Sequence, residues 1–169
     1  VVNDRSCVRL RPAYRDHVWS YDFVHDRTHD GRAFRMLTLI DEYTRECLAI
    51  DVSRRITSES VLERLSNLLV RRGVPNHIRS DNGPEFGQQF EAQIDPRIKV
   101  THGPAYSSNS QGEVENANKI WRGVMRRLLH SKDAKPQQWS KHLVRVNEIM
   151  NARPNESIGW KTSAQVLHG

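Results

Sequence analysis

The sequence predicts an α/β fold, in which a five-stranded mixed sheet is flanked by helices. Two observations carry this prediction. Three β-rich segments follow one another at short spacing between residues 18 and 52, which favours an antiparallel meander. Two further β-rich segments alternate with helical patterns later in the chain, which is typical of βαβ units. The predicted element order, β-β-β-α-β-α-β-α-α, indicates one layered domain.

The strand segments combine β-branched and aromatic residues between turn-rich boundaries. The first, VWSYDFV, is separated from the second by the loop HDRTHDGR at 25–32. The fourth, HIRS, runs directly into Asp81. The five predicted strands cover residues 18–24, 34–40, 46–52, 77–80 and 97–102.

The helical segments place apolar residues at helical spacing. In the first, five apolar residues between positions 61 and 69 form one stripe, Thr57 or Ser58 caps its start, and Gly73 ends it. A long helix over 111–130 has apolar residues at alternating spacings of three and four. The remaining predicted helices are a short one after Pro84, one over 136–151 and a last one from Thr162.

Composition bounds the class of protein. A chain of 169 residues suits one domain of ordinary size, and no apolar run reaches the ~18 residues of a membrane span. The tryptophans are expected in the core rather than at an interface. They are Trp19, Trp121, Trp139 and Trp160.

The net charge and the cysteines indicate what kind of partner and which redox compartment to expect. The net charge of +6 favours a polyanionic partner, although an ordinary basic surface explains it equally well. Cys7 and Cys47 lack zinc-site spacing, so we expect free thiols in a reducing, intracellular compartment. The polar start carries no secretory signal and no initiator Met, and we expect the chain to be a piece of a longer protein.

Three acids lie where such a sheet could bring them together. Asp22 stands inside the first strand between two aromatic residues, where an unpartnered carboxylate is costly. Asp81 follows the fourth strand, at the carboxyl end where α/β folds place their sites. Glu115 lies near the start of the long helix, beside its apolar stripe. Each has an alternative: the solvent face of an edge strand for Asp22, a turn for Asp81, and a favourable helix-dipole position for Glu115.

If the three acids converge, their oxygens suit Mg²⁺ or Mn²⁺. Three carboxylates can hold two ions, and two ions about 3.5–4 Å apart serve phosphodiester chemistry. No Ser-His-Asp arrangement, HExxH spacing or GxxxxGK[ST] loop competes. The face of the long helix that begins at Glu115 continues with Lys119, Arg122 and Arg126, which suits a crossing DNA backbone; the alternative is a solvated helix face.

Four segments resemble the catalytic core of the integrase and transposase superfamily with an Asp-Asp-Glu site. Residues 18–50 are similar to the start of the core in bacterial insertion-sequence transposases, and GVPNHIRSDNGPEF is similar to its second motif. SQGEVENANK resembles the third motif of retroviral and retrotransposon integrases, and MNARPNESIGWKTSAQVLHG resembles the end of such cores. The resemblance implies an RNase H-like catalytic core over 16–169, preceded by a lead-in segment over 1–15.

The resemblance carries the catalytic and metal-binding roles onto Asp22 in YDF, Asp81 in SDNG and Glu115 in QGEVE. The segment between the last two acids has 33 residues, where the family often has 35, and the shortening falls between residues 86 and 100. The family's flexible active-site loop corresponds to 103–110. Six residues are predicted to contact DNA, the first five from the resemblance and the last from helix spacing: Tyr106, Gln111, Asn118, Lys119, Arg122 and Arg126.

The family mechanism implies metal-dependent polynucleotidyl transfer. Asp22 and Asp81 would share one ion, and Asp22 and Glu115 would hold the other. The enzyme would nick a mobile-element end, and the freed 3′-OH would attack target DNA. Joining two ends in concert implies a homo-oligomer.

The resemblance also leaves points open. The zinc-binding and C-terminal β-barrel modules of many integrases are missing from this chain. The compartment would be the cytoplasm of a bacterium or the nucleus of a eukaryote. An RNase H-like nuclease without strand transfer and a domesticated DNA-binding module are the alternative functions, and the three intact acids argue against the second.

Overall fold

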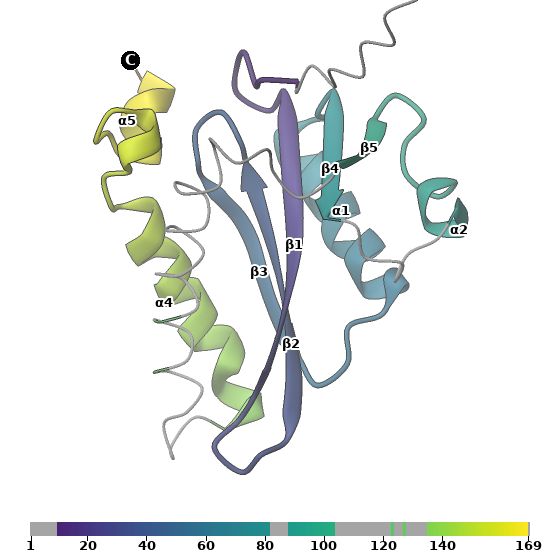
Figure 1. The fold of residues 1–169 in the computed structure, drawn as a ribbon, viewed down its shortest axis with the longest axis vertical. Coiled ribbons are helices and arrows are strands. Elements are labelled where there is room, and N and C mark those ends of the chain that lie inside the picture. The colour runs from purple at the N-terminus through teal and green to yellow at the C-terminus, as the bar shows by residue number, and fades with distance from the viewer. Residues whose placement is uncertain (1–9, 82–87, 104–122, 124–126, 128–134, 169) are drawn as a thin grey trace, which may run out of the picture.

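In the computed structural model, residues 10–81, 88–103, 123, 127 and 135–168 are described (Figure 1). Five strands form one sheet: Val18–Arg27 (β1), Ala33–Asp41 (β2), Cys47–Ser53 (β3), His77–Asp81 (β4) and Lys99–Gly103 (β5). The helices are Ser58–Arg72 (α1), Gln88–Glu91 (α2), Trp139–Asn151 (α4) and Ser163–His168 (α5), with 3₁₀ turns at Pro136–Gln138 (η1) and Glu156–Ile158 (η2).

The sheet is mixed, with the order β3-β2-β1-β4-β5. β1, β2 and β3 pair antiparallel, so the predicted meander is confirmed. β1 pairs with β4, and β4 with β5, in parallel. β1 is therefore the central strand, with an antiparallel neighbour on one side and a parallel neighbour on the other.

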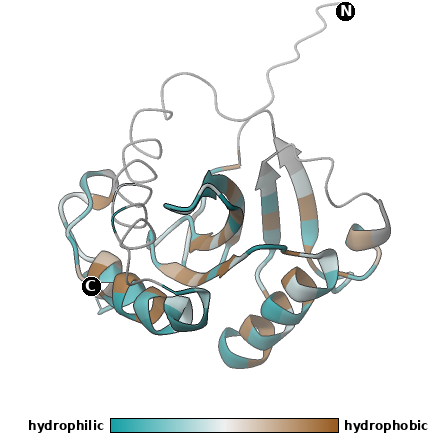
Figure 2. Cartoon of the chain, turned by 90° about the horizontal axis from the view of Figure 1, so that it is seen from below, coloured by the Kyte–Doolittle hydropathy of each residue, from teal (hydrophilic) through white to brown (hydrophobic). Residues whose placement is uncertain are grey.

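Successive side chains of β1 alternate between two packed faces. Trp19 and Tyr21 belong to a core under α1, whereas Val24 packs in a second core under α4. Figure 2 shows hydrophobic and hydrophilic residues side by side on both helices, as expected of helices that cover a sheet. The buried helix residues are Val61, Leu65 and Leu68 of α1 and Trp139, Leu143 and Val146 of α4.

Helix α1 begins and ends where its sequence signals lie. The Thr57 hydroxyl accepts a hydrogen bond from the backbone N–H of Ser60 at 3.3 Å, while the Ser60 hydroxyl accepts one from the backbone N–H of Thr57 at 3.0 Å. This reciprocal capping box identifies Thr57 as the cap. Gly73 ends the helix with φ of 96°, a conformation that favours glycine.

The other boundaries differ from prediction by a few residues. The helix predicted over 136–151 opens with the 3₁₀ turn η1 before α4. The last strand begins at Lys99 rather than at residue 97, because Asp95 accepts a hydrogen bond from the backbone N–H of Arg97 and holds it in a turn. Of the predicted helix over 111–130, only residues 123 and 127 lie within the described part, and both are helical.

The tryptophans divide between core and surface. Trp19 and Trp139 are buried, as predicted, and Trp121 lies outside the described residues. The prediction is wrong for Trp160, which is 68% exposed. Its φ of 60° places it in a left-handed turn, where its backbone N–H donates to the carbonyl of Asn155 at 2.9 Å. This backbone geometry leaves the indole on the surface.

The free thiol predicted at Cys47 is confirmed. Cys47 is a free, buried thiol, and burial raises its pKa well above the ordinary value, so it stays protonated. Cys7 lies outside the described residues.

Residues 10–17 lie against β4. The carbonyl of Leu10 accepts a hydrogen bond from Arg79 at 2.9 Å, and the Tyr14 hydroxyl donates to Asn76, just before the strand, at 3.1 Å. The Tyr14 ring also stacks on His17, with 4.5 Å between centroids. The boundary between lead-in and core near residue 16 stays a prediction.

The packing of α1 makes a stability prediction. Leu65 is 3% exposed, and Leu65→Ala removes methyl groups that fill the core under this helix. We expect a loss of about 2–5 kcal/mol in the free energy of unfolding. Val70, on the same helix, is 87% exposed, and Val70→Ala should change it by less than about 0.5 kcal/mol. Urea denaturation of both variants measures the difference, and equal losses would contradict the packing described.

A second prediction concerns pH. His77 has a lowered pKa, first because burial disfavours its charged form, and then because His17, Lys99 and Arg79 repel a proton. The pKa of His77 in the folded state thus lies below its ordinary value of 6.5. Neutral His77 therefore makes its full contribution to the free energy of unfolding above pH 6.5, and that contribution is lost as the pH falls through the folded-state pKa, because the unfolded chain binds the proton more readily. His77→Gln should flatten the fall in unfolding free energy between neutral and mildly acid pH. His29→Gln, at an exposed position, is the control; an equal flattening there would refute the assignment.

Candidate catalytic site

Asp22 lies in the middle of the central strand. It is half-buried, and β1 pairs with β2 at Asp22 itself and with β4 as far as Tyr21, the residue just before it. The alternative that placed Asp22 on the solvent face of an edge strand is therefore wrong. A carboxylate at a half-buried position in a sheet needs partners or a cation to offset the water it has lost.

The side chain of Asp22 lies on the face of the sheet that α4 covers. Alternation along β1 places it with Ser20 and Val24, and across the antiparallel pair it faces Thr38. Thr38 is buried, with 6% exposure, and the sequence reasoning did not single it out. The available signal was a polar residue inside the otherwise apolar run MLTLI of the second strand.

The parallel register brings the second acid to the first. Tyr21 pairs with Ser80, so the next positions along the two strands are Asp22 and Asp81, which is the last residue of β4. Neighbouring strands lie about 4.8 Å apart. Two positions that are 58 residues apart in the chain thus become neighbours at the point where β4 ends. This agrees with the predicted place of Asp81 after the fourth strand.

A hydrogen bond fixes this register on the other face of the sheet. The side chains of Tyr21 and Ser80 are hydrogen bonded, and both are buried, with 6% and 3% exposure. Burial raises the pKa of Tyr21 above its ordinary value, more than the Ser80 hydroxyl lowers it. The phenol is therefore neutral at physiological pH and acts as a structural link between β1 and β4.

The other predicted site residues lie outside the described part of the chain. The third acid, Glu115, is among them, and so are the predicted DNA contacts Tyr106, Gln111, Asn118, Lys119, Arg122 and Arg126. Within residues 10–81, 88–103 and 135–168, no group of three or more His, Cys, Asp or Glu side chains is arranged to hold a metal ion. Of the predicted catalytic set, the structure brings together positions 22 and 81.

Competing acids near the sheet have structural partners. Asp41 is fully buried and accepts hydrogen bonds from the backbone N–H groups of Asp16 and Tyr43 and from the Thr44 hydroxyl, all at 3.0–3.1 Å. Asp51 forms an ion pair with Arg64 of α1. These carboxylates hold turns and helices in place. Two further acids that lie near the predicted site residues in the sequence, Glu85 and Glu113, are outside the described residues.

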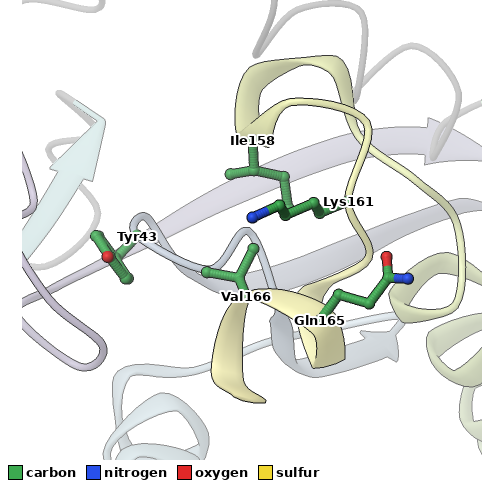
Figure 3. Close-up of a pocket in the computed structure, with 5 residues that line it drawn as sticks. All are labelled: Tyr43, Ile158, Lys161, Gln165 and Val166. Carbon is green, nitrogen blue, oxygen red and sulfur yellow. The ribbon is translucent and has the colours of Figure 1, made fainter. Parts of the chain in front are cut away.

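A surface pocket lies beside the β2–β3 turn. It is lined by Tyr43 from the β2–β3 turn and by Ile158, Lys161, Gln165 and Val166 from the η2–α5 region (Figure 3). In the sequence, Tyr43 comes five residues after Thr38, the partner of Asp22, and two residues beyond the end of β2. The described residues that line this pocket include no acid, and Asp22 is not among them, so the pocket lies apart from the predicted catalytic residues that the structure describes.

Comparison with known proteins identifies the family. The profile of the family described as "Integrase core domain" matches residues 13–120. The chain belongs to this family. The predicted resemblance to an integrase or transposase catalytic core is confirmed.

Relatives come from both bacteria and retroviruses. An insertion element IS476 protein of 39.2 kDa from Xanthomonas euvesicatoria, described as uncharacterized, is 31% identical over 158 residues. That match covers 87% of this chain and 43% of the bacterial protein, so the chain spans less than half of that relative.

Solved integrase structures share the fold. The simian T-cell lymphotropic virus intasome, in complex with PP2A regulatory subunit B56 gamma, superposes with a TM-score of 0.74 at 23% identity, over 95% of this chain and 57% of that one. The HTLV-2 integrase catalytic core domain, in complex with magnesium and in a dimeric form, gives 0.64 at 20% identity, over 91% and 97%. The predicted RNase H-like fold is confirmed. Among the described residues, no helix is long and apolar enough to cross a bilayer.

Proposed function

We propose that this chain is the catalytic core of a polynucleotidyl transferase that nicks the ends of a mobile DNA element and joins them to target DNA. The observation that carries the proposal is the parallel register of β1 and β4, which makes Asp22 and Asp81 neighbours in the centre of the sheet. Membership of the integrase core family supports the same reaction class. Glu115 is proposed as the third catalytic acid.

The donor set fits a hard divalent cation. Carboxylate oxygens are the ligands that Mg²⁺ and Mn²⁺ prefer, and Asp22, Asp81 and Glu115 would hold them. When bound, two such ions supply activation of the attacking oxygen and charge stabilisation of the leaving oxygen. The protein's own contribution is positional. β1 and β4 place Asp22 and Asp81 at neighbouring positions of the sheet, and α4 covers the face on which Asp22 lies. The magnesium bound to the HTLV-2 core domain supports this assignment.

The proposal extends to partners and location. Tyr106, Gln111, Asn118, Lys119, Arg122 and Arg126 are proposed to contact DNA. The active form is proposed to be a homo-oligomer of the whole protein, with modules outside this chain that bind element ends. Residues 16–169 are proposed as the catalytic core and 1–15 as a lead-in. The reaction is proposed to take place inside the cell, in bacterial cytoplasm or a eukaryotic nucleus.

Loss of one proposed catalytic acid should abolish both nicking and joining. Asp22→Asn keeps the size of the side chain and removes its charge, so we expect strand transfer and disintegration of labelled DNA with Mn²⁺ or Mg²⁺ to fall by at least roughly 10²–10³-fold. Asp81→Asn and Glu115→Gln should do the same, and EDTA should silence the wild type. Asp26→Asn, on the same strand and face as Asp22, is the matched control and should keep activity.

The products separate the alternatives. Joined products that the Asp22→Asn variant loses support the transferase, whereas cleavage without joining points to a nuclease. If the wild type is silent, thermal unfolding with and without Mn²⁺ decides whether the site exists. A midpoint that Mn²⁺ raises in the wild type and in Asp26→Asn, but not in Asp22→Asn, supports the metal site. An equal rise in all three refutes it.

The predicted DNA contact at Lys119 has a separate signature. Lys119→Ala should weaken binding of duplex DNA of any sequence and lower the slope of log affinity against log salt by about 1, because one fewer counterion is released. A salt titration by fluorescence anisotropy measures it. An unchanged slope would favour the solvated helix face.

A further inference from the structure

Thr38 places a hydroxyl group opposite the proposed catalytic Asp22. The two residues are partners in the antiparallel pair of β1 and β2. The register of this pair continues without a shift from Trp19 to Arg27 on β1, so the strand fixes the position of Asp22 against Thr38 from both sides.

Backbone hydrogen bonds hold the two strands together at this pair. The backbone N–H of Glu42 donates to the carbonyl of Val18 at 3.0 Å, in the same register. In an antiparallel ladder every second pair exchanges both of its backbone hydrogen bonds, and steps of two residues from Val18 reach Asp22. Side chains that stand directly opposite in such a ladder have Cβ atoms about 4.5–5.5 Å apart, which brings a hydroxyl within reach of a carboxylate.

The other neighbours of the Thr38 side chain are apolar. Thr38 is buried and lies on the face of the sheet that α4 covers. The pairing of β2 with β3 places Ile50 on its other side, and the preceding residue of β2 on this face is Met36. Both are buried in the core under α4. Of these three neighbours, Asp22 carries the side chain that accepts hydrogen bonds strongly.

This setting favours a hydrogen bond between the two side chains. Burial of a hydroxyl group costs free energy unless the group is hydrogen bonded, and a carboxylate gives a strong, charge-assisted bond. The same combination occurs just after β2, where the Thr44 hydroxyl donates to a carboxylate oxygen of Asp41 at 3.1 Å. There a threonine helps to hold an aspartate in one orientation.

We propose that Thr38 is a positioning residue for Asp22: its hydroxyl donates to one carboxylate oxygen and leaves the other oxygen for the divalent cation. This inference rests on the proposed function, because Thr38 has this task only if Asp22 holds a cation. A carboxylate that is already held in one orientation loses less freedom when the cation binds. Outer hydrogen-bond partners of metal ligands commonly contribute about 10–100-fold to metal affinity.

Binding of Mn²⁺ alone tests the proposal without activity. A titration is followed by the electron paramagnetic resonance signal of the free ion. Thr38→Val keeps the branched shape and removes the hydroxyl, so we expect the apparent affinity for Mn²⁺ to fall by about 10-fold. Thr38→Ser keeps the hydroxyl and should bind Mn²⁺ like the wild type. Unchanged affinity in Thr38→Val, or an equal loss in Thr38→Ser, overturns the proposal.

Thr101→Val is the matched control, because it makes the same chemical change elsewhere in the sheet. Thr101 lies on β5, two strands away from β1, and its hydroxyl is buried without a hydrogen-bond partner among the described residues. This variant should keep the Mn²⁺ affinity of the wild type. Equal losses in Thr38→Val and Thr101→Val would reveal a general effect on the sheet and reject the positioning role.

Strand transfer gives a second readout. Thr38→Val should need about 10-fold more Mn²⁺ for half-maximal activity and should regain full activity at saturating Mn²⁺. Its affinity for duplex DNA in EDTA should equal that of the wild type, because Thr38 is buried. A loss of activity that saturating Mn²⁺ does not restore indicates a packing defect and counts against the proposal.

Folding and the proposed function are checked separately. If Thr38→Val unfolds at a lower temperature in EDTA, Thr38→Ser decides, since it loses a methyl group and keeps the hydroxyl: retained Mn²⁺ affinity supports the hydrogen bond, and lost affinity overturns it. If the wild type shows no Mn²⁺ binding that depends on Asp22, the proposed function fails and this inference fails with it. Binding that depends on Asp22 but is unaffected in Thr38→Val rejects the positioning role alone.

Discussion

The parallel pairing of β1 with β4 is the constraint on which the rest of the structure depends. It gives the central strand two different neighbours, because β2 already pairs with its other edge in the antiparallel sense. Trp19 and Ile78 meet across this pair, and both are fully buried. A slip of one residue would turn each side chain to the opposite face, so the buried pair also fixes the level at which Asp22 and Asp81 stand.

The acids of this protein divide according to what satisfies their oxygens. Asp41 is fully buried, yet it accepts three hydrogen bonds, from the backbone N–H groups of Asp16 and Tyr43 and from the Thr44 hydroxyl. It thereby organises the β2–β3 turn. Glu42 is paired with Arg79 through two hydrogen bonds of 2.8–2.9 Å. Asp22 differs because its strand position, rather than a turn, brings it beside another acid. Burial alone therefore does not separate the proposed catalytic carboxylate from the structural ones, whereas its position beside Asp81 in the strand register does.

Many of the arginines serve the fold, so the net charge says little about where a polyanion would bind. Arg72 bridges Asp16 and Glu46, Arg79 pairs with Glu42, and each of these side chains is largely buried. Such pairs hold the N-terminal segment and the β2–β3 turn against the sheet, and their charges cancel locally. The electrostatic field outside the molecule comes from the exposed cations that remain.

By itself, the sequence determined what depends on near neighbours: the strand composition, the apolar stripe of α1, and its boundaries at Thr57 and Gly73. The family followed from its motifs. The short spacing of the first three strands also predicted their antiparallel pairing. Only the tertiary structure decided that β1 pairs with β4 and β4 with β5, because these hydrogen bonds join residues far apart in the chain and leave no local pattern. It therefore decided that Asp22 stands in a central strand beside the position of Asp81, that Thr38 faces it, and that Trp160 lies on the surface.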